Sequence, residues 1–472
     1  MHLVAVGGSD AGIAAALRAR ELDPSVDVSV VVADRYPNFS ICGIPYLVSG
    51  DVRDWRTLAH RSIADLQAAG VRLLLNTTAN TVEVDARRLS LTDGDGRESR
   101  LLYDELVIGT GAIPVRPPIG GLDTLGPDDG VFLLHTMGDT FALTRFIDMH
   151  HSATAIIVGA GYLGLEMAEA LTARGMRVTQ VEMLTEVLPT VDPSLGRLVR
   201  DRLIEAGVEV LTETTVLRID PSGTKLRVLG DHQLDRTVDL LLVVAGVQPD
   251  TTLAAAAGAR LGPRGAIDVD RRMRTGIPHV WAAGDCAVTH HRLLGTTYLP
   301  LGTTAHKQGR IAGENAVGGN REFAGVLGTQ VVKVFDLAAA RTGLRDTEAR
   351  QAGFDPRSVE SDADDHKAYY PGAHSIRIRV TADTATHRLL GVQMVGHKDA
   401  AVAKRIDIAA TAIHHGMTID ELADLDLSYT PPLGSPWDAV QMAAHAWERA
   451  MQHRSTSKLA EPTGTPARTT TP

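Results

Sequence analysis

Residues 155–164 read AIIVGAGYLG, an apolar run that ends in the glycine pattern Gly159-Ala160-Gly161-Tyr162-Leu163-Gly164. The apolar run predicts a buried strand, and the stretch from Leu165 to Arg174 predicts a helix. In such a pattern the first glycine makes the tight turn and the second lets a pyrophosphate approach the backbone. The third lets the helix pack closely on the strand, and the helix N-terminus faces the phosphates. This stretch therefore predicts a dinucleotide-binding unit.

An acidic residue completes this unit. A predicted strand from Met176 to Val181 ends at Glu182, 18 residues after Gly164. A carboxylate there can bind both ribose hydroxyls, and its charge repels a 2′-phosphate. No Arg or Lys occurs between Met183 and Thr190. We therefore expect NADH as the cofactor, with NADPH as the less favoured alternative.

The same pattern occurs at the start of the chain, 152 residues earlier. The apolar run 3–6 leads into Gly7-Gly8-Ser9-Asp10-Ala11-Gly12, with Ser9 in place of the second glycine. A second apolar run, 26–32, precedes Asp34. A later strand-like run, 280–283, leads into Gly284-Asp285, an acid suited to the ribityl and phosphate region of a flavin. Two such units predict an α/β fold with two Rossmann-like dinucleotide-binding domains.

The composition of the chain argues against some classes of function. The chain has 472 residues, 47 Lys+Arg against 57 Asp+Glu, and only 4% aromatic residues. A net charge of −10 and few aromatic rings argue against nucleic-acid binding. We find no signal peptide and no apolar stretch of about 20 residues, so we expect a cytoplasmic protein without a membrane span. No metal site is predicted.

Two cysteines, Cys42 and Cys286, are too few for a disulfide framework. Cys286 directly follows Gly284-Asp285, which favours a structural role. Cys42 lies shortly after the acid that ends a strand, at the edge of the sheet where ligands bind. Spacing alone leaves two readings open, a small buried hydrophobic residue or a thiol made reactive by a following helix N-terminus.

Five segments resemble the pyridine nucleotide-disulfide oxidoreductases, in their single-cysteine branch of coenzyme A-disulfide reductases, NADH oxidases, NADH peroxidases and persulfide reductases. The resemblance spans about residues 1–450. It is carried by SICGIPY (40–46), YDELVIGTGAIP (103–114), GAGYLGLE (159–166), VWAAGDC (280–286) and GTQVVKVF (328–335).

The resemblance implies FAD in the first unit, NAD(P)H in the second, and a C-terminal α+β dimerisation domain in a homodimer. The implied bounds are 1–116 and 250–325 for the FAD-binding domain, 117–249 for the NAD(P)H-binding domain, 326–452 for the dimerisation domain, and a disordered tail at 453–472. Cys42 would lie against the flavin, Tyr162 would cover it, and Glu166 would lie near the nicotinamide. The full set of expected cofactor-binding residues is Gly7, Gly8, Ser9, Gly12, Asp34, Arg35, Thr110, Gly111, Ala112, Gly159, Gly161, Tyr162, Gly164, Glu166, Glu182, Gly246, Asp285, Gly302 and Thr303.

One absence points to the subclass. Two-cysteine members carry a second cysteine five positions on, where this chain has Leu47. Cys42 would therefore be oxidised as a mixed disulfide with a small thiol, a persulfide or a sulfenic acid. Oxidase and peroxidase members carry a histidine where this chain has Asp10, which weakens the reading as a peroxide reductase.

The resemblance to coenzyme A-disulfide reductases also implies catalytic tyrosines from the partner subunit. Tyr429 matches one of them, and Tyr369 or Tyr370 matches the other; the alternative is that they are core or interface residues. Arg18 and Arg20 are read as solvated charges or as contacts to a coenzyme A phosphate. We expect reduction of a small disulfide or persulfide, with NADH oxidase and a redox sensor without turnover as alternatives.

Overall fold

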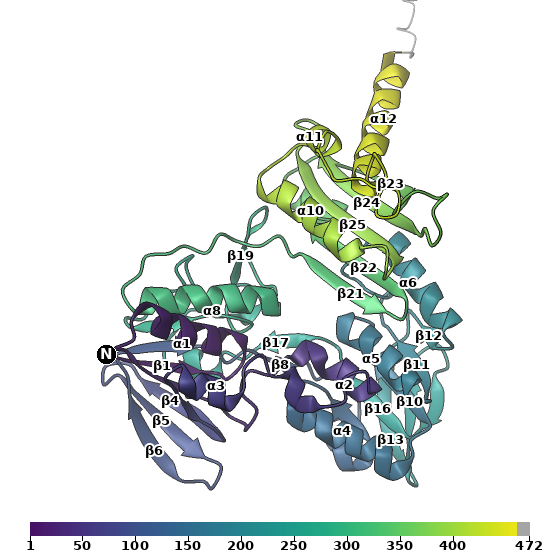
Figure 1. Ribbon diagram of the computed structural model, residues 1–472. Coiled ribbons are helices and arrows are strands. Elements are labelled where there is room, and N and C mark those ends of the chain that lie inside the picture. Colours follow the sequence, from purple (N-terminus) through teal and green to yellow (C-terminus); the bar gives the residue numbers. More distant parts are fainter. Residues whose placement is uncertain (460–472) are drawn as a thin grey trace, which may run out of the picture. The chain divides into compact units, whose positions relative to one another are not determined.

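The computed structural model describes the backbone of residues 1–459 and the side chains of residues 1–452. The chain divides into two compact units, Met1–Gly328 and a second unit that begins at Thr329 (Figure 1). Each unit is described here by itself.

A parallel sheet with strand order β18-β7-β1-β2-β3 forms the first half of unit 1. Its strands are β1 (His2–Val6), β2 (Asp27–Val31), β3 (Val71–Leu74), β7 (Glu105–Ile108) and β18 (Val280–Ala282). Strand β1 pairs in parallel with β2 on one side and with β7 on the other. The glycine-rich turns and the acidic residues that follow these parallel strands therefore lie at the same edge of the sheet.

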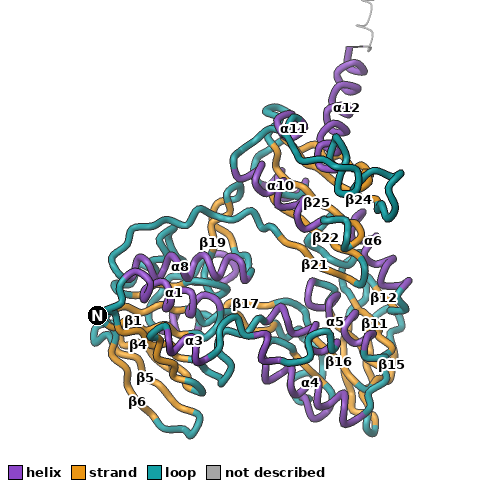
Figure 2. The backbone as a smooth tube through the Cα atoms, viewed as in Figure 1, coloured by secondary structure: helices purple, strands orange, loops and turns teal. Residues whose placement is uncertain are grey.

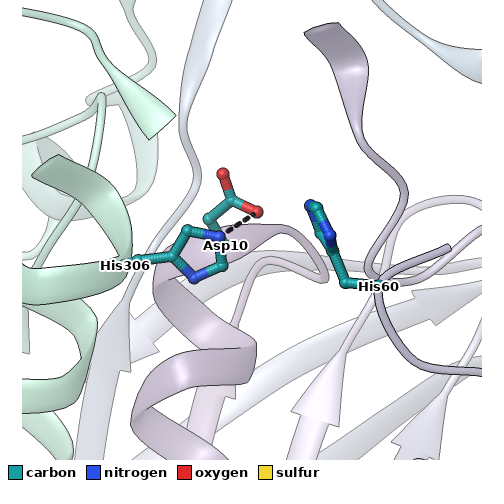
Figure 3. Close-up of side chains that lie close together, drawn as sticks. All are labelled: Asp10, His60 and His306. Carbon is teal, nitrogen blue, oxygen red and sulfur yellow. Dashed lines mark ion pairs between the residues drawn. The ribbon is translucent and has the colours of Figure 1, made fainter. Parts of the chain in front are cut away.

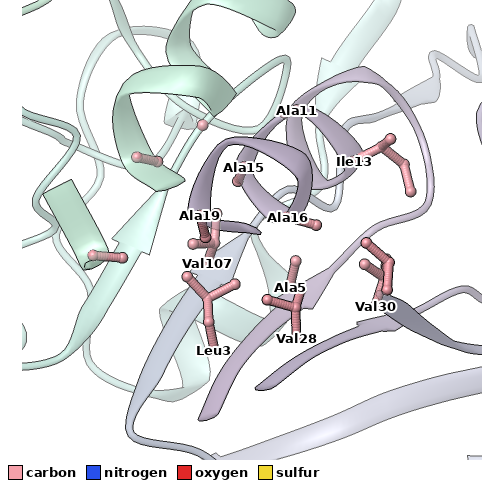
Figure 4. Close-up of a cluster of buried hydrophobic side chains, with 14 of the residues drawn as sticks. Leu3, Ala5, Ala11, Ile13, Ala15, Ala16, Ala19, Val28, Val30 and Val107 are labelled. Carbon is pink, nitrogen blue, oxygen red and sulfur yellow. The ribbon is translucent and has the colours of Figure 1, made fainter. Parts of the chain in front are cut away.

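Two helices pack closely on this sheet, α1 (Asp10–Leu22) and α8 (Gly302–Ala316). A Cβ atom on Gly309 would lie 2.2 Å from the carbonyl oxygen of Ala11, and one on Gly313 would lie 2.2 Å from that of Ala15. The alanines of α1 and the glycines of α8 thus let the two backbones touch. The buried side chains beneath α1, including Leu3 and Val30, are shown in Figure 4.

The second half of unit 1 repeats this arrangement. Its parallel sheet has the order β12-β11-β10-β16-β9. The elements are β9 (Val131–Leu133), α4 (Met137–His150), β10 (Thr154–Val158), α5 (Tyr162–Ala173), β11 (Arg177–Val181), α6 (Pro193–Glu205), β12 (Glu209–Leu211) and β16 (Leu240–Val243). The prediction of two dinucleotide-binding folds is confirmed.

Smaller elements complete unit 1. The antiparallel sheet β4 (Thr77–Glu83), β5 (Arg88–Asp93), β6 (Glu98–Leu102) appears as adjacent strands in Figure 2. The others are α2 (Ile44–Ser49), α3 (Ile63–Ala68), β8 (Ala112–Pro114), β13 (Val216–Ser222), β14 (Lys225–Gly230), β15 (Asp235–Val238), β17 (Val247–Pro249), α7 (Thr252–Ala256), β19 (Thr289–His291) and β20 (Gly295–Thr297).

Unit 2 is an antiparallel sheet of order β21-β22-β25-β24-β23 with helices. The elements are β21 (Gln330–Val334), β22 (Leu337–Gly343), α9 (Asp346–Gln351), β23 (Pro356–Asp364), β24 (Ser375–Asp383), β25 (Leu389–His397), α10 (Val402–His414), α11 (Ile419–Ala423) and α12 (Ala439–Leu459). The expected separate α+β domain is confirmed.

Two boundaries differ from the sequence analysis. Unit 2 begins at Thr329 rather than at residue 326. Helix α12 continues to Leu459, past residue 453, where we expected order to end. The segment 453–459 contains no Pro or Gly, so nothing in it stops a helix already nucleated upstream. The rest of the expected tail, 460–472, lies outside the described residues. Among the described residues no helix is long and apolar enough to span a membrane.

Candidate active site

The turn that carries Cys42 is the centre of the candidate site. Residues Ile41–Gly43 form a 3₁₀ turn, and α2 begins at Ile44 with Pro45 in its first turn. A Cβ on Gly43 would lie 2.5 Å from the end of the Leu58 side chain, so a larger residue here would displace Leu58. The turn therefore holds Cys42 at the surface, with the residue exposed. The reading of Cys42 as a small buried hydrophobic residue is wrong.

The electrostatic setting of Cys42 does not favour the thiolate, which was the second of the two readings left open by the spacing. Desolvation by the surrounding chain raises the pKa of the Cys42 thiol, and the carboxylates of Glu166, Asp10 and Asp285 raise it further. Helix α2 has only six residues, so its N-terminal dipole is weak beside these charges. The surroundings of Cys42 thus favour the thiol.

The first glycine pattern forms the turn that we expected for FAD. Gly7 has φ +119°, and a Cβ there would lie 1.9 Å from the carbonyl oxygen of Gly109. A Cβ on Gly12 would lie 2.0 Å from the carbonyl oxygen of Gly7. Ser9 is the extended N-cap residue of α1. Asp34 follows β2, and its partial burial raises its pKa. The positions of Gly8 and Ser9 in this turn leave the backbone of the α1 N-terminus open to a phosphate.

Asp285 provides a direct test of whether FAD fits. Its carboxyl accepts a hydrogen bond from the backbone N–H of Leu301, just before α8, whose first residues are Gly302 and Thr303. Its Oδ1 atom is buried and has no hydrogen-bond partner among the described residues. Burial, and then the charge of Asp10, raise the pKa of Asp285 to about 6. A buried acceptor without a donor fits a ligand hydroxyl such as those of the FAD ribityl chain.

The second glycine pattern is built in the same way. Gly159 has φ +103°, and a Cβ on Gly164 would lie 2.0 Å from its carbonyl oxygen. Around Gly161, by contrast, a Cβ would meet nothing within 4 Å, which leaves room for a pyrophosphate. Glu182 is buried and accepts hydrogen bonds from the backbone N–H groups of Ala160 (2.8 Å) and Leu184 (2.9 Å). These bonds fix the carboxylate beside the glycine turn.

Three polar side chains lie where the first half of unit 1 meets the second half. Tyr162 is the first residue of α5, and its hydroxyl accepts a hydrogen bond from Thr190 at 3.1 Å. One turn later on α5, Glu166 accepts a hydrogen bond from the hydroxyl of Tyr46 at 3.3 Å. Tyr46 lies on α2, four residues after Cys42. The structure therefore brings Cys42, Tyr46 and Glu166 together, and the sequence analysis did not single out Tyr46.

Most of the remaining expected cofactor contacts lie on the segments that connect the two halves of unit 1. Thr110 donates a hydrogen bond to the carbonyl oxygen of Asp250 at 2.6 Å. Gly111 and Gly246 have positive φ with open space around them, next to the paired strands β8 and β17. Ala112 is the first residue of β8, and Arg35 is exposed after β2.

In unit 2 the structure distinguishes the two neighbouring tyrosines. Tyr369 and Tyr429 share a hydrogen bond, which is the main cause of the raised pKa of Tyr369. Tyr370 instead lies edge-on to His366, with ring centroids 5.8 Å apart. All three tyrosines are exposed. Tyr369 rather than Tyr370 is therefore the partner of Tyr429.

The arginines of α1 are not freely solvated, contrary to one of our readings. Arg18 forms an ion pair with Glu314 at 2.7 Å. Arg20 donates hydrogen bonds to the carbonyl oxygens of Ala69 (3.3 Å) and Val26 (2.9 Å). Both pack against neighbouring segments because α1 is held between them. Cys286 is fully buried, as expected of a structural residue.

A cavity of about 830 Å³ in unit 1 was not expected from the sequence. It runs along α1, and the residues that line it include Asn38, which lies four positions before Cys42. Three cationic side chains also line it, Arg20, Arg61 and Arg310. These come from three distant segments of the chain, so no local motif reveals them.

Comparisons with known proteins agree with this geometry. A family model described as pyridine nucleotide-disulphide oxidoreductase matches residues 1–309, and its dimerisation-domain model matches residues 329–440. The NAD(P)H sulfur oxidoreductase (CoA-dependent) of Pyrococcus abyssi is 35% identical over 444 residues, covering 94% of this chain and 97% of the relative. The NADH oxidase of Methanocaldococcus jannaschii is 32% identical over 447 residues, covering 94% and 98%. The solved NAD-dependent persulfide reductase from A. fulgidus has a TM-score of 0.91 and 37% identity, covering 97% of this chain and 84% of that chain.

Proposed function

Since the chain belongs to the pyridine nucleotide-disulphide oxidoreductase family, we propose that it reduces the sulfur–sulfur bond of a coenzyme A persulfide or disulfide at Cys42. This proposal rests on the different exposure of the two cysteines. Cys42 is exposed at the candidate site, whereas Cys286 is buried. Cys42 has no second thiol at this site with which to form an internal disulfide, so a sulfur–sulfur bond to Cys42 has to form by reaction with the substrate.

FAD, when bound, accepts hydride from NADH and delivers two electrons to sulfur. The chain supplies the thiol and the surroundings of each step. The Cys42 thiolate attacks one sulfur of the acceptor, the acceptor's S–S bond breaks, and the departing sulfur takes up a proton. Two electrons then break the new bond between Cys42 and sulfur, which regenerates the thiolate.

The arginine-lined cavity supports coenzyme A as the carrier of the sulfur. Phosphate groups bind best to guanidinium groups that donate charge-assisted hydrogen bonds. Arg61 is exposed at the cavity, and Arg310 forms an ion pair with Glu21 at 3.0 Å. The same cavity reaches Asn38, on the segment that leads to Cys42. A nucleotide in this cavity would direct its thiol arm toward Cys42.

In a homodimer, the partner subunit would supply the proton donor for the departing sulfur. The hydrogen-bonded pair Tyr369 and Tyr429 is exposed on unit 2, in the domain whose family model is described as a dimerisation domain. From the partner subunit, a phenol of this pair would donate its proton to the departing sulfur.

The cavity assignment is tested with Arg61→Ala and Arg310→Ala, measured as the KM for coenzyme A persulfide. Loss of a charged phosphate contact costs about 1.5–3 kcal/mol, so we expect KM to rise roughly 10- to 100-fold with little change in kcat. The control is Arg145→Ala, which removes an exposed arginine of α4 away from the cavity. An unchanged KM in both cavity variants would exclude the cavity as the coenzyme A site.

A further inference from the structure

Three metal-binding side chains converge beside the candidate site. Asp10 is the first residue of α1, His60 follows a short turn at residues 55–58, and His306 lies in the second turn of α8 (Figure 3). One ligand atom from each residue lies within 4.8 Å of the other two. His306 Nε2 is 3.2 Å from Asp10 Oδ1, and the two imidazole centroids are 5.7 Å apart.

The backbone beneath these side chains is well fixed. Helices α1 and α8, which carry Asp10 and His306, touch along the Gly309–Ala11 and Gly313–Ala15 contacts described above. The backbone N–H of His60 donates a hydrogen bond to the carbonyl oxygen of Asn38 at 2.9 Å. Both imidazoles are exposed, so they can turn without disturbing the core. The site therefore combines a rigid base with adjustable ligands.

The chemistry of this group suits a divalent transition metal. Two imidazoles and a carboxylate are ligands of Zn²⁺, with metal–ligand bonds of about 2.0–2.2 Å. In a tetrahedral site with such bonds the ligand atoms lie about 3.5 Å apart, so the widest pair needs to close by about 1.3 Å at most. The Asp10–His306 pair is already at a suitable separation. A metal ion would replace the proton that these two groups share.

The surrounding charges are mixed. Asp285 is close enough for Asp10 to act on its carboxyl, and a cation bound to Asp10 would relieve that repulsion. His60 and His306 line the arginine-lined cavity themselves, and Arg61 and Arg310 of the same cavity oppose a cation. Direct coordination by three ligands outweighs these longer-range repulsions, which water in the open cavity screens.

We propose that Asp10, His60 and His306 form a binding site for one divalent transition-metal ion of the Zn²⁺ type, with water completing the coordination. Cys42 is not a ligand of this site, although the charge of Asp10 acts on its thiol. The site does not depend on which sulfur compound the protein reduces.

The test is Zn²⁺ titration of the FAD-loaded, chelator-treated full-length protein, followed by calorimetry, with no sulfur substrate present. We expect one Zn²⁺ per chain, and an affinity at least about tenfold weaker in His60→Gln and in Asp10→Asn. The control is His290→Gln, because His290 lies beside Arg271 and Arg292 rather than beside other ligands. Flavin absorbance and circular dichroism report whether each variant is folded.

A second measurement on the unaltered protein separates this site from Cys42. Zinc K-edge X-ray absorption should give only nitrogen and oxygen ligands near about 2.0 Å, and the Cys42→Ser variant should bind Zn²⁺ with the same affinity. A sulfur ligand near about 2.3 Å, equal affinities in wild type, His60→Gln and Asp10→Asn, or no Zn²⁺ binding at all would overturn the proposal.

Discussion

The hydroxyl of Tyr46 donates a hydrogen bond to Glu166 across 3.3 Å, which joins the helix that follows the Cys42 turn to the first helix of the second nucleotide-binding unit. Glu166 in turn raises the pKa of the Cys42 thiol. The side chain expected near the nicotinamide is therefore coupled electrostatically to the thiol that receives the electrons.

This coupling predicts the pH dependence of thiol reactivity. A negative charge on Glu166 disfavours the thiolate, so Glu166→Gln should move the pH profile of Cys42 alkylation by iodoacetamide to lower pH. Glu169→Gln is the matched control, because Glu169 acts on Tyr46 but is not among the main causes of the Cys42 shift. A profile that stays in place or moves to higher pH in Glu166→Gln would contradict the coupling.

Asp285 should determine how tightly FAD is held. A hydrogen bond to a charged group contributes about 1.5–3 kcal/mol, so Asp285→Asn should weaken FAD binding roughly 10- to 100-fold. Flavin fluorescence during titration of the flavin-free protein measures this affinity. Asp268→Asn, which breaks only the ion pair with Arg260 at 3.5 Å, should leave the affinity unchanged.

The raised pKa of Asp285 adds a pH dependence to the same binding. With a pKa of about 6, the carboxyl of the flavin-free chain is largely neutral below that pH and ionised above it. A ligand hydroxyl that donates to this carboxyl favours the ionised form, so FAD affinity should rise as pH increases through about 6. The Asp285→Asn variant should lack this rise; an equal rise in both proteins would assign it to another group.

Glu182 should make NADH the preferred donor. Its carboxylate is fixed by two backbone N–H groups, and the next residue, Met183, is 68% exposed. We expect kcat/KM for NADH to exceed that for NADPH at least about tenfold. Met183→Arg should raise kcat/KM for NADPH roughly tenfold by pairing with the 2′-phosphate. Equal use of both nucleotides by the wild type would contradict the role given to Glu182.

The tyrosine pair of unit 2 should act in turnover. Tyr429→Phe and Tyr369→Phe each remove the shared hydrogen bond and are expected to lower kcat for coenzyme A persulfide roughly 10- to 100-fold. Tyr370→Phe is a natural control, because it alters the neighbouring residue without touching that bond. If Tyr370→Phe has the larger effect, the assignment of Tyr369 is wrong.

The sequence predicted best those parts of the structure that depend on residues close together in the chain. The glycine patterns at 7–12 and 159–164 predicted both parallel sheets, because backbone approaches of about 2 Å at Gly12 and Gly164 tolerate no side chain. The turn at Cys42 is likewise built from neighbouring residues, with Gly43 just before α2 and Pro45 in its first turn.

Contacts between distant segments could not be predicted in this way. Tyr46 and Glu166 are 120 positions apart, and Asp10 and His306 are nearly 300 apart. Each pair forms only when two helices from distant parts of the sequence pack together, α2 with α5 and α1 with α8. The ion pair between Arg18 and Glu314 escaped the sequence analysis for the same reason.

The most direct test of the central claim is a stopped-flow experiment on Cys42→Ser with NADH and coenzyme A persulfide. We expect the variant to retain FAD and to be reduced by NADH, while its steady-state reduction of the persulfide is lost. Continued persulfide reduction by Cys42→Ser would contradict the role of this thiol. In the wild type, oxygen consumption with NADH that is faster than persulfide reduction, or no turnover with any sulfur acceptor, would equally contradict the proposed function.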